Sequence, residues 1–117
     1  MAFKFENLEV WQRSIETSHK ISELVKKFPK DELFVLTSQL KRSADSVSLN
    51  IAEGSTSQSN SEFNRFLSYA LRSAIELVGA LFLARKRQLI EEKEFFNLYN
   101  EIEVTVKMIQ SLRKSVK

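Results

Sequence analysis

The segment from Asn60 to Arg87 constrains the fold most, because it carries two apolar stripes at helical spacing. The first stripe recurs at alternating steps of four and three residues, which keeps its members on one face of a helix. Its members are Phe63, Leu67, Ala70, Ala74, Leu77, Leu81 and Ala84. The second stripe lies roughly 90° around the same helix and consists of Leu71, Ile75, Val78 and Phe82. The first stripe predicts the core face of one chain, and the second predicts an interface with another copy.

The chain has few points at which a helix must stop, since it contains only two glycines and one proline. Apolar residues recur at helical spacing on either side of these points, and no alternating strand pattern competes. We expect four helices, over residues 6–28, 30–54, 60–87 and 90–115. Short connections between long helices predict an all-α fold, an antiparallel up-down four-helix bundle that forms a single domain over residues 1–117.

The expected helix ends carry local signals. Pro29 suits the first turn of a helix and ends the helix before it. Gly54 is expected to end the second helix in the left-handed conformation, which glycine adopts readily. Ser59 and Glu62 predict a capping box at the start of the third helix. The break before the fourth helix is poorly marked, but the acidic run that follows Ile90 suits a helix N-terminus.

Composition and charge narrow the range of functions. The chain contains no cysteine, so disulfides and thiolate metal sites are excluded, and a cytoplasmic location is the natural expectation. No apolar segment approaches the roughly 20 residues of a membrane span, so we expect no contact with a membrane. The formal charge of +3 permits binding to nucleic acid without requiring it.

Signatures of catalysis are missing from the sequence. Two isolated glycines cannot form a phosphate-binding loop, which needs several backbone amides close to the anion. Glu16 and His19 have the Glu-x-x-His spacing of di-iron bundles, but that site needs two such motifs and His19 is the only histidine. No second histidine is available to activate a serine nucleophile. We therefore expect no enzyme activity, no catalytic residue, no metal and no cofactor.

An uncharged polar row lies beside the core stripe of the second helix. It consists of Gln39, Ser43, Ser46 and Asn50, at spacings of four, three and four residues. Two interpretations stay open: the row forms structural hydrogen bonds across a helix interface, or it is an ordinary solvated flank.

Basic residues on the third helix are the main candidates for binding nucleic acid. Arg65, Arg72 and Lys86 lie away from the core at multiples of seven residues, with Gly79 at the intervening position. They would either meet phosphates or form a solvated outer face. Lys41 and Arg42 on the second helix are further candidates. Other basic clusters stand at helix C-terminal ends, where the helix dipole accounts for them.

The order of several short motifs resembles a known family. The blocks are Phe5-x-x-Leu8-x-Val10-Trp11-Gln12, Phe28-Pro29-x-x-Glu32-Leu33, Leu36-Thr37-Ser38-Gln39-Leu40, Ser46-Val47-x-x-Asn50-Ile51-Ala52-Glu53-Gly54 and Glu62-Phe63-x-x-Phe66-Leu67. Together they resemble the four-helix bundle proteins encoded within intervening sequences of bacterial 23S ribosomal RNA genes, to which the accessory variability protein of diversity-generating retroelements is similar. The resemblance implies a ring-like homopentamer and, by analogy with the accessory protein, contact with nucleic acid.

The chain departs from the family pattern at a few positions. Ser57 and Gln58 stand where relatives often carry a basic residue, Ser48 stands where proline is common, and Arg72 replaces a small residue before Ser73. Combining residues and resemblance, we predict a non-enzymatic homo-oligomeric scaffold that binds RNA or DNA through basic patches. The alternative is an adaptor that binds only a protein, encoded nearby, and makes no contact with nucleic acid.

Overall fold

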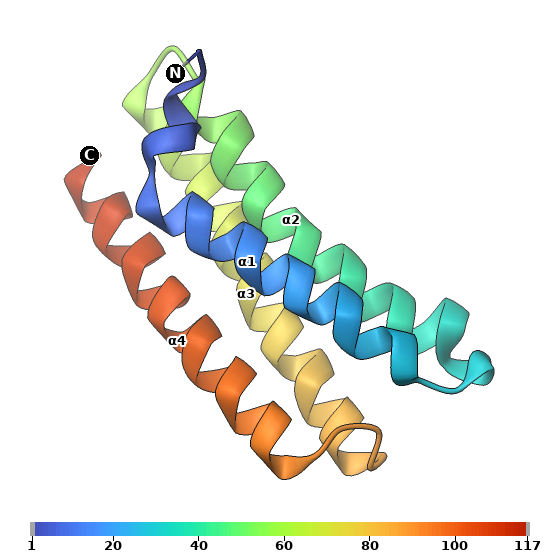
Figure 1. The fold of residues 1–117 in the computed structure, drawn as a ribbon. Helices are drawn as coiled ribbons and strands as arrows, with labels where there is room; N and C mark the ends of the chain where they lie inside the picture. The colour runs from blue at the N-terminus through green and yellow to red at the C-terminus, as the bar shows by residue number, and fades with distance from the viewer. Residues whose placement is uncertain (1, 117) are drawn as a thin grey trace.

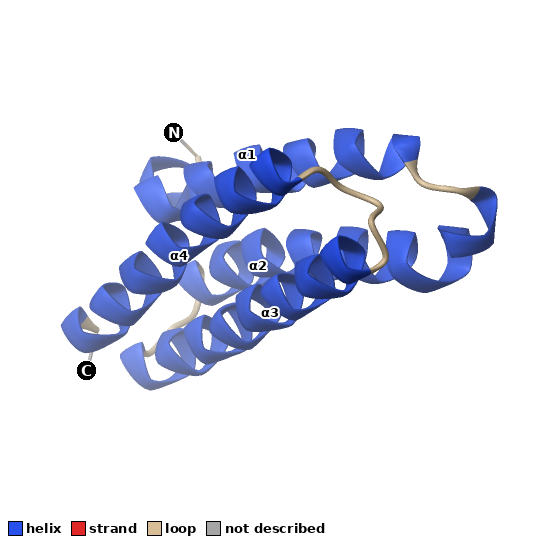
Figure 2. Cartoon of the chain, turned by 90° about the horizontal axis from the view of Figure 1, so that it is seen from below, coloured by secondary structure: helices blue, strands red, loops and turns tan. Residues whose placement is uncertain are grey.

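Four α-helices form the bundle in the computed structural model, which describes residues 2–116 (Figure 1). Their bounds are α1 Glu9–Leu24, α2 Ser38–Ser55, α3 Asn60–Lys86 and α4 Glu92–Ser115. Only helices and connecting segments occur within this described part (Figure 2). The bundle measures 43 × 22 × 22 Å. The all-α fold with four helices, predicted from periodicity, is confirmed.

The connections between helices lie at two ends of the bundle. The α1–α2 and α3–α4 connections lie at one end, while the α2–α3 connection lies at the other end, together with both termini (Figures 1 and 2). The contact between α2 and α3 is the most extensive of the bundle, and the contact between α1 and α4 is much smaller. The four helices are therefore packed unequally, with the closest association between α2 and α3.

The core lies along the first apolar stripe of α3. All seven members of that stripe are buried, which confirms the face predicted for them. They belong to one hydrophobic cluster with fully buried side chains of the other three helices, among them Ile21, Leu40, Ile51, Ile102 and Ile109. Burial of these side chains removes apolar surface from water and is the main force that holds the four helices together.

Two helix starts differ in structure from those expected, and α4 begins at Glu92 instead of the expected residue 90. The α-helix expected from residue 6 begins at Glu9, after a short 3₁₀ helix, Lys4–Asn7. The helix expected from residue 30 consists of a 3₁₀ turn, Lys30–Glu32, and a π-helical turn, Leu33–Thr37, before α2 begins. Four consecutive apolar residues cannot all face one core on a regular helix. The wider π turn brings Leu36 and Thr37 into the core and leaves residues 33–35 exposed.

Gly54 does not end α2 in the left-handed conformation, and this expectation is wrong. The helix continues to Ser55, and neither glycine of the chain has a positive φ. A Cβ at Gly54 would lie 2.5 Å from Cβ of Phe66 and 3.1 Å from Cδ1 of Phe63. Glycine is needed here because α2 and α3 approach so closely that there is no room for a Cβ.

The left-handed residue instead stands after α3. Gln88 has φ 59°, its N–H donates to the carbonyl of Arg85 at 3.0 Å, and the N–H of Leu89 donates to the carbonyl of Ala84 at 2.9 Å. This pair of hydrogen bonds is the Schellman ending of a helix. It places the break between α3 and α4 in the region where the sequence gives the weakest signal.

The starts of α3 and α4 are capped, although the capping box predicted at Ser59 and Glu62 forms only in part. The Ser59 hydroxyl accepts a hydrogen bond from the Glu62 N–H at 3.1 Å, which is one half of the expected capping box. At the start of α4, the Glu94 carboxylate accepts from the Glu91 N–H at 3.0 Å. Both contacts satisfy backbone donors that have no partner within the first turn of a helix.

α3 is more apolar than expected. It contains an 18-residue window of mean hydropathy 1.5, which by length and composition alone is enough to cross a membrane, so that expectation needs correction. The core helix of a bundle passes the same test, and α3 packs against both α2 and α4. Only 33% of the window is buried, so α3 carries apolar surface beyond what the core of one chain uses.

The two glycines provide a matched test of the α2–α3 approach. We expect Gly54→Ala to destabilise the protein by about 1–3 kcal/mol, because the added methyl group meets Phe66. Gly79→Ala should stabilise it by about 0.5–1 kcal/mol, because a Cβ there meets nothing within 4 Å and alanine favours a helix. Denaturant unfolding measures both changes, and a stabilising Gly54→Ala would show that the helices can separate without cost.

Candidate nucleic-acid and assembly surfaces

The basic residues singled out from the sequence are all exposed. Arg65, Arg72 and Lys86 follow one another along the outer face of α3, and Gly79 lies exposed between them. Lys41 and Arg42 are exposed on α2. The acidic residues Glu62 and Glu76 also lie exposed on α3, so the outer face is basic in patches and not along its whole length.

Ion pairing separates these candidates from five other basic residues. Within residues 2–116, five ion pairs form: Lys20–Glu101, Lys26–Glu23, Lys27–Glu94, Arg85–Glu92 and Arg87–Glu32. Lys26 and Lys27 after α1, and Arg85 and Arg87 at the end of α3, thus neutralise carboxylates of the same chain. None of the five candidate residues belongs to a pair in this part of the chain, and their charge is available to an anion from outside.

An aromatic pair that the sequence analysis overlooks lies beside the basic residues. The guanidinium carbon of Arg65 lies 5.7 Å from the ring centre of Phe66, and the Phe66 ring meets Tyr69 edge to face at 5.7 Å. Tyr69 is 39% exposed. The available signal is its spacing, four residues after Arg65 and three before Arg72, which places the three side chains on one face.

The second apolar stripe divides into exposed and half-buried members. Ile75 is 58% and Phe82 is 46% exposed, whereas Leu71 and Val78 are half-buried against the core. The Phe82 ring packs against Phe95 of α4 at 4.9 Å. Ile75 and Val78 line a groove of about 180 Å³ between α3 and α4, together with Tyr99, Glu103 and Val106. Of the four, Ile75 contributes most to the free surface and Phe82 is shared with α4.

A second exposed apolar region, which the sequence analysis does not identify, lies at the α1–α2 end. The exposed side chains of Leu33, Phe34 and Val35 form what we call the 33–35 turn, and Phe34 is 89% exposed. A groove of about 590 Å³ runs beside it between the start of α2 and the end of α3. Its lining residues are Val35, Leu36, Gln39, Glu76, Gly79, Ala80, Leu83 and Arg87. The two apolar surfaces lie in different grooves, one on each flank of α3.

The polar row of α2 makes hydrogen bonds within α2 and to α3. Ser43 is buried and its hydroxyl donates to the carbonyl of Gln39 at 2.8 Å. The hydroxyls of Ser46 and Ser73 lie 2.8 Å apart and join α2 to α3. The amide of Asn50 donates to the carbonyl and the hydroxyl of Ser46, at 2.8 and 3.0 Å. These contacts favour the structural interpretation of the row over the solvated flank.

Polar groups also join α1 to α4. The carboxylate of Glu101 accepts hydrogen bonds from the Thr17 hydroxyl and the Lys20 ammonium group, both at 2.8 Å. His19 lines the adjacent groove of about 410 Å³, and both His19 and Glu16 are exposed. Among the described residues, no three His, Cys, Asp or Glu side chains form a group that would hold a metal ion.

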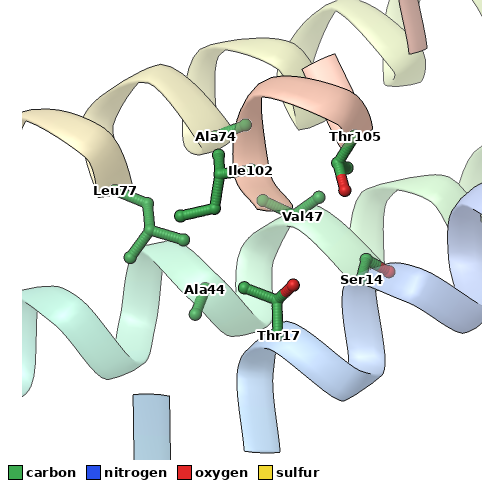
Figure 3. A pocket seen from close by; sticks show the side chains of 8 residues that line it. All are labelled: Ser14, Thr17, Ala44, Val47, Ala74, Leu77, Ile102 and Thr105. Atoms are coloured by element: carbon green, nitrogen blue, oxygen red, sulfur yellow. The ribbon is translucent and has the colours of Figure 1, made fainter. Parts of the chain in front are cut away.

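The centre of the bundle offers no room for a ligand. Figure 3 shows the side chains from all four helices that line a cavity there. The volume of this cavity is about 10 Å³. Its hydroxyl groups are already bonded: Ser14 donates to the carbonyl of Trp11 at 2.6 Å, and Thr17 donates to Glu101. Ligand pockets usually enclose about 300–1,000 Å³, so the candidate sites of this protein lie on its surface.

Glu94 gives a pH-dependent test of the α1–α4 seam. The Glu94 carboxylate accepts a hydrogen bond from Lys27 and a second one from the Glu91 N–H. These two contacts, and the one from Lys27 most of all, hold the pKa of this carboxyl below its ordinary value. A carboxyl whose pKa is lower in the folded state stabilises the fold fully at pH values above its pKa in the unfolded state. This stabilisation is lost as the pH falls through the pKa of the folded state. We expect Glu94→Gln to cost less than about 1 kcal/mol at neutral pH and nothing in strong acid.

Denaturant unfolding across the acid range measures this difference. Glu16→Gln is the control, because this exposed carboxylate lies outside the five ion pairs and the variant loses the same charge. A stability loss from Glu94→Gln that persists unchanged in acid would contradict the assignment to the ionised carboxylate.

Comparison with known proteins agrees with the resemblance carried by the sequence motifs. A solved structure of a protein with unknown function from the S23 ribosomal protein family of Bacteroides thetaiotaomicron VPI-5482 is similar, with a TM-score of 0.84 and 28% identity over 90% of this chain and 95% of that one. No curated protein matches the chain. The family described as 23S rRNA-intervening sequence protein matches residues 6–111. The chain therefore belongs to the 23S rRNA-intervening sequence protein family.

Proposed function

We propose that this protein is a non-enzymatic, homo-oligomeric helical scaffold of the cytoplasm that binds RNA or DNA through basic surface patches. The proposal rests on which of the basic side chains form ion pairs within the chain. The exposed residues Arg65, Arg72, Lys86, Lys41 and Arg42 lie outside the ion pairs of the described chain, whereas Lys20, Lys26, Lys27, Arg85 and Arg87 are paired. Unpaired cations on a rigid helix suit contact with phosphates.

Assembly would multiply these patches. The proposed assembly is the ring-like homopentamer of antiparallel up-down bundles that the family resemblance implies. Exposed apolar side chains on two different flanks of α3, at Ile75 and at Leu83, support contacts that join unlike faces, and unlike faces can close into a ring. Five copies at +3 each carry a formal charge of +15. Weak patches repeated around a ring bind a long polyanion with high avidity.

The alternative function is a protein adaptor whose partner is encoded nearby. The 33–35 turn favours the adaptor, because an exposed apolar side chain such as Phe34 is typical of a surface that binds another protein. Recovery of a stoichiometric protein partner that nuclease treatment does not remove would support the adaptor over the nucleic-acid scaffold.

Substitutions in the two apolar stripes test the assembly. We expect Ile75→Asp to reduce the native mass measured by light scattering while the circular dichroism of the helices is retained, because Ile75 is 58% exposed in one chain. Leu77→Asp should unfold the protein, since Leu77 is 1% exposed and a buried charge is costly. Equal loss of helicity in both variants would place both stripes in one core, and a monomeric wild-type protein would contradict the assembly.

Neutralising the unpaired cations tests the binding to nucleic acid. We expect a triple variant, Arg65→Gln with Arg72→Gln and Lys86→Gln, to bind RNA and DNA more weakly and to reduce the slope of log K against log salt by about 2–3. Fluorescence anisotropy over a salt series, with a labelled oligonucleotide, measures both quantities.

A matched triple variant controls for net charge. Lys20→Gln with Lys26→Gln and Lys27→Gln removes the same three charges from ion-paired positions, and it should keep most of the affinity. Equal losses in the two triple variants would mean that only net charge matters. Wild-type affinity that does not change with salt, or no affinity at low salt, would contradict binding through phosphates.

A further inference from the structure

Arg65, Tyr69 and Arg72 form a compact group on the exposed face of α3. Tyr69 follows Arg65 by four residues and precedes Arg72 by three, so along the helix axis it stands about 6 Å from one and about 4.5 Å from the other. Tyr69 is 39% exposed, and both arginines are exposed. The group therefore presents one aromatic ring between two cations.

The ring of Tyr69 is held at a rigid part of the bundle. Its neighbour Phe66, which it meets edge to face at 5.7 Å, lies against Gly54 of α2, where a Cβ would be 2.5 Å from Cβ of Phe66. One turn after Tyr69, Ser73 bonds Ser46 of α2 at 2.8 Å. Tyr69 thus stands between two points that fasten α3 to α2. A pre-positioned ring loses little conformational freedom when a ligand stacks on it.

The charges around Tyr69 fit a short stretch of a polyanion. Neither arginine belongs to an ion pair in the described chain, and Arg65 extends over the Phe66 ring at 5.7 Å. Glu62 and Glu76 stand about one turn beyond the two arginines and limit the basic patch at both ends. The favourable region for phosphates is therefore centred on Tyr69.

We propose that Tyr69, flanked by Arg65 and Arg72, is a stacking site for an unpaired base of single-stranded RNA or DNA, whose neighbouring phosphates meet the two arginines. The inference rests on the proposed binding to nucleic acid. In a duplex the faces of the bases are covered by their stacked neighbours, so Tyr69 cannot stack on them. Single strands expose those faces, and aromatic side chains with nearby cations are the usual platform for them. The site therefore prefers single strands over duplexes.

Substitutions at Tyr69 test the site with two labelled probes, an oligouridylate and an RNA duplex of equal length. We expect Tyr69→Leu to weaken binding of the oligouridylate about fivefold or more and to leave binding of the duplex unchanged. Tyr69→Phe should bind like the wild type, because it keeps the ring. Circular dichroism and native mass confirm that each variant is folded and assembled as the wild type is.

Phe96→Leu is the matched control. Phe96 is another exposed aromatic residue beside an arginine, 5.0 Å from Arg85, but that arginine is paired with Glu92. The Phe96→Leu variant should bind both probes like the wild type. Wild-type binding without a preference for the single strand, or an undiminished affinity in Tyr69→Leu, overturns the stacking site and leaves the proposed function standing. No wild-type binding to either probe overturns both.

Discussion

The close approach of α2 and α3 is the contact on which the other features of this bundle depend. Gly54 lets the two helices meet at Phe66, and small residues on the buried face of α3 allow close packing along its length. These residues are Ala70, Ala74, Ala80 and Ala84. Dense packing of small side chains gains many van der Waals contacts and leaves little freedom for the helices to shift. It determines which side chains of α3 face α2 and which remain outside.

The α1–α4 side of the bundle is held in a different way. There Glu101 accepts hydrogen bonds from Thr17 and Lys20, and Lys27 pairs with Glu94, while the contact between the two helices is small. Exposed ion pairs contribute little to stability but depend strongly on geometry. We infer that the α2–α3 contact supplies stability and that the α1–α4 contacts fix the register of the helices. The most firmly held helices are thus those that carry the candidate binding residues.

Periodicity is enough to predict α3 and its buried face, because it depends only on spacing within one helix. Gly54 shows where local reasoning fails: a glycine needed for a left-handed turn and a glycine needed for space look the same in a sequence. Gln88 is the converse case, a left-handed residue that is not glycine. The π turn at Leu33–Thr37 depends on how Leu36 meets the core, which is a tertiary contact and cannot be inferred from four consecutive apolar residues.

For the candidate site, the sequence predicts which basic residues lie on the outer face of α3 but not which of them stay unpaired. The carboxylate that pairs with Lys20 lies 81 residues away in the sequence and the one that pairs with Arg87 lies 55 residues away, so these two pairs depend on the fold. The pairing matters because α3 has to supply the core, the proposed assembly contacts and the proposed anion site from one set of positions. Because the positions of α3 are shared among these three roles, only a few of them can carry a basic side chain for the anion site. In the proposed function, strong binding by such a chain would require many copies, which would link the apolar flank of α3 to its basic face.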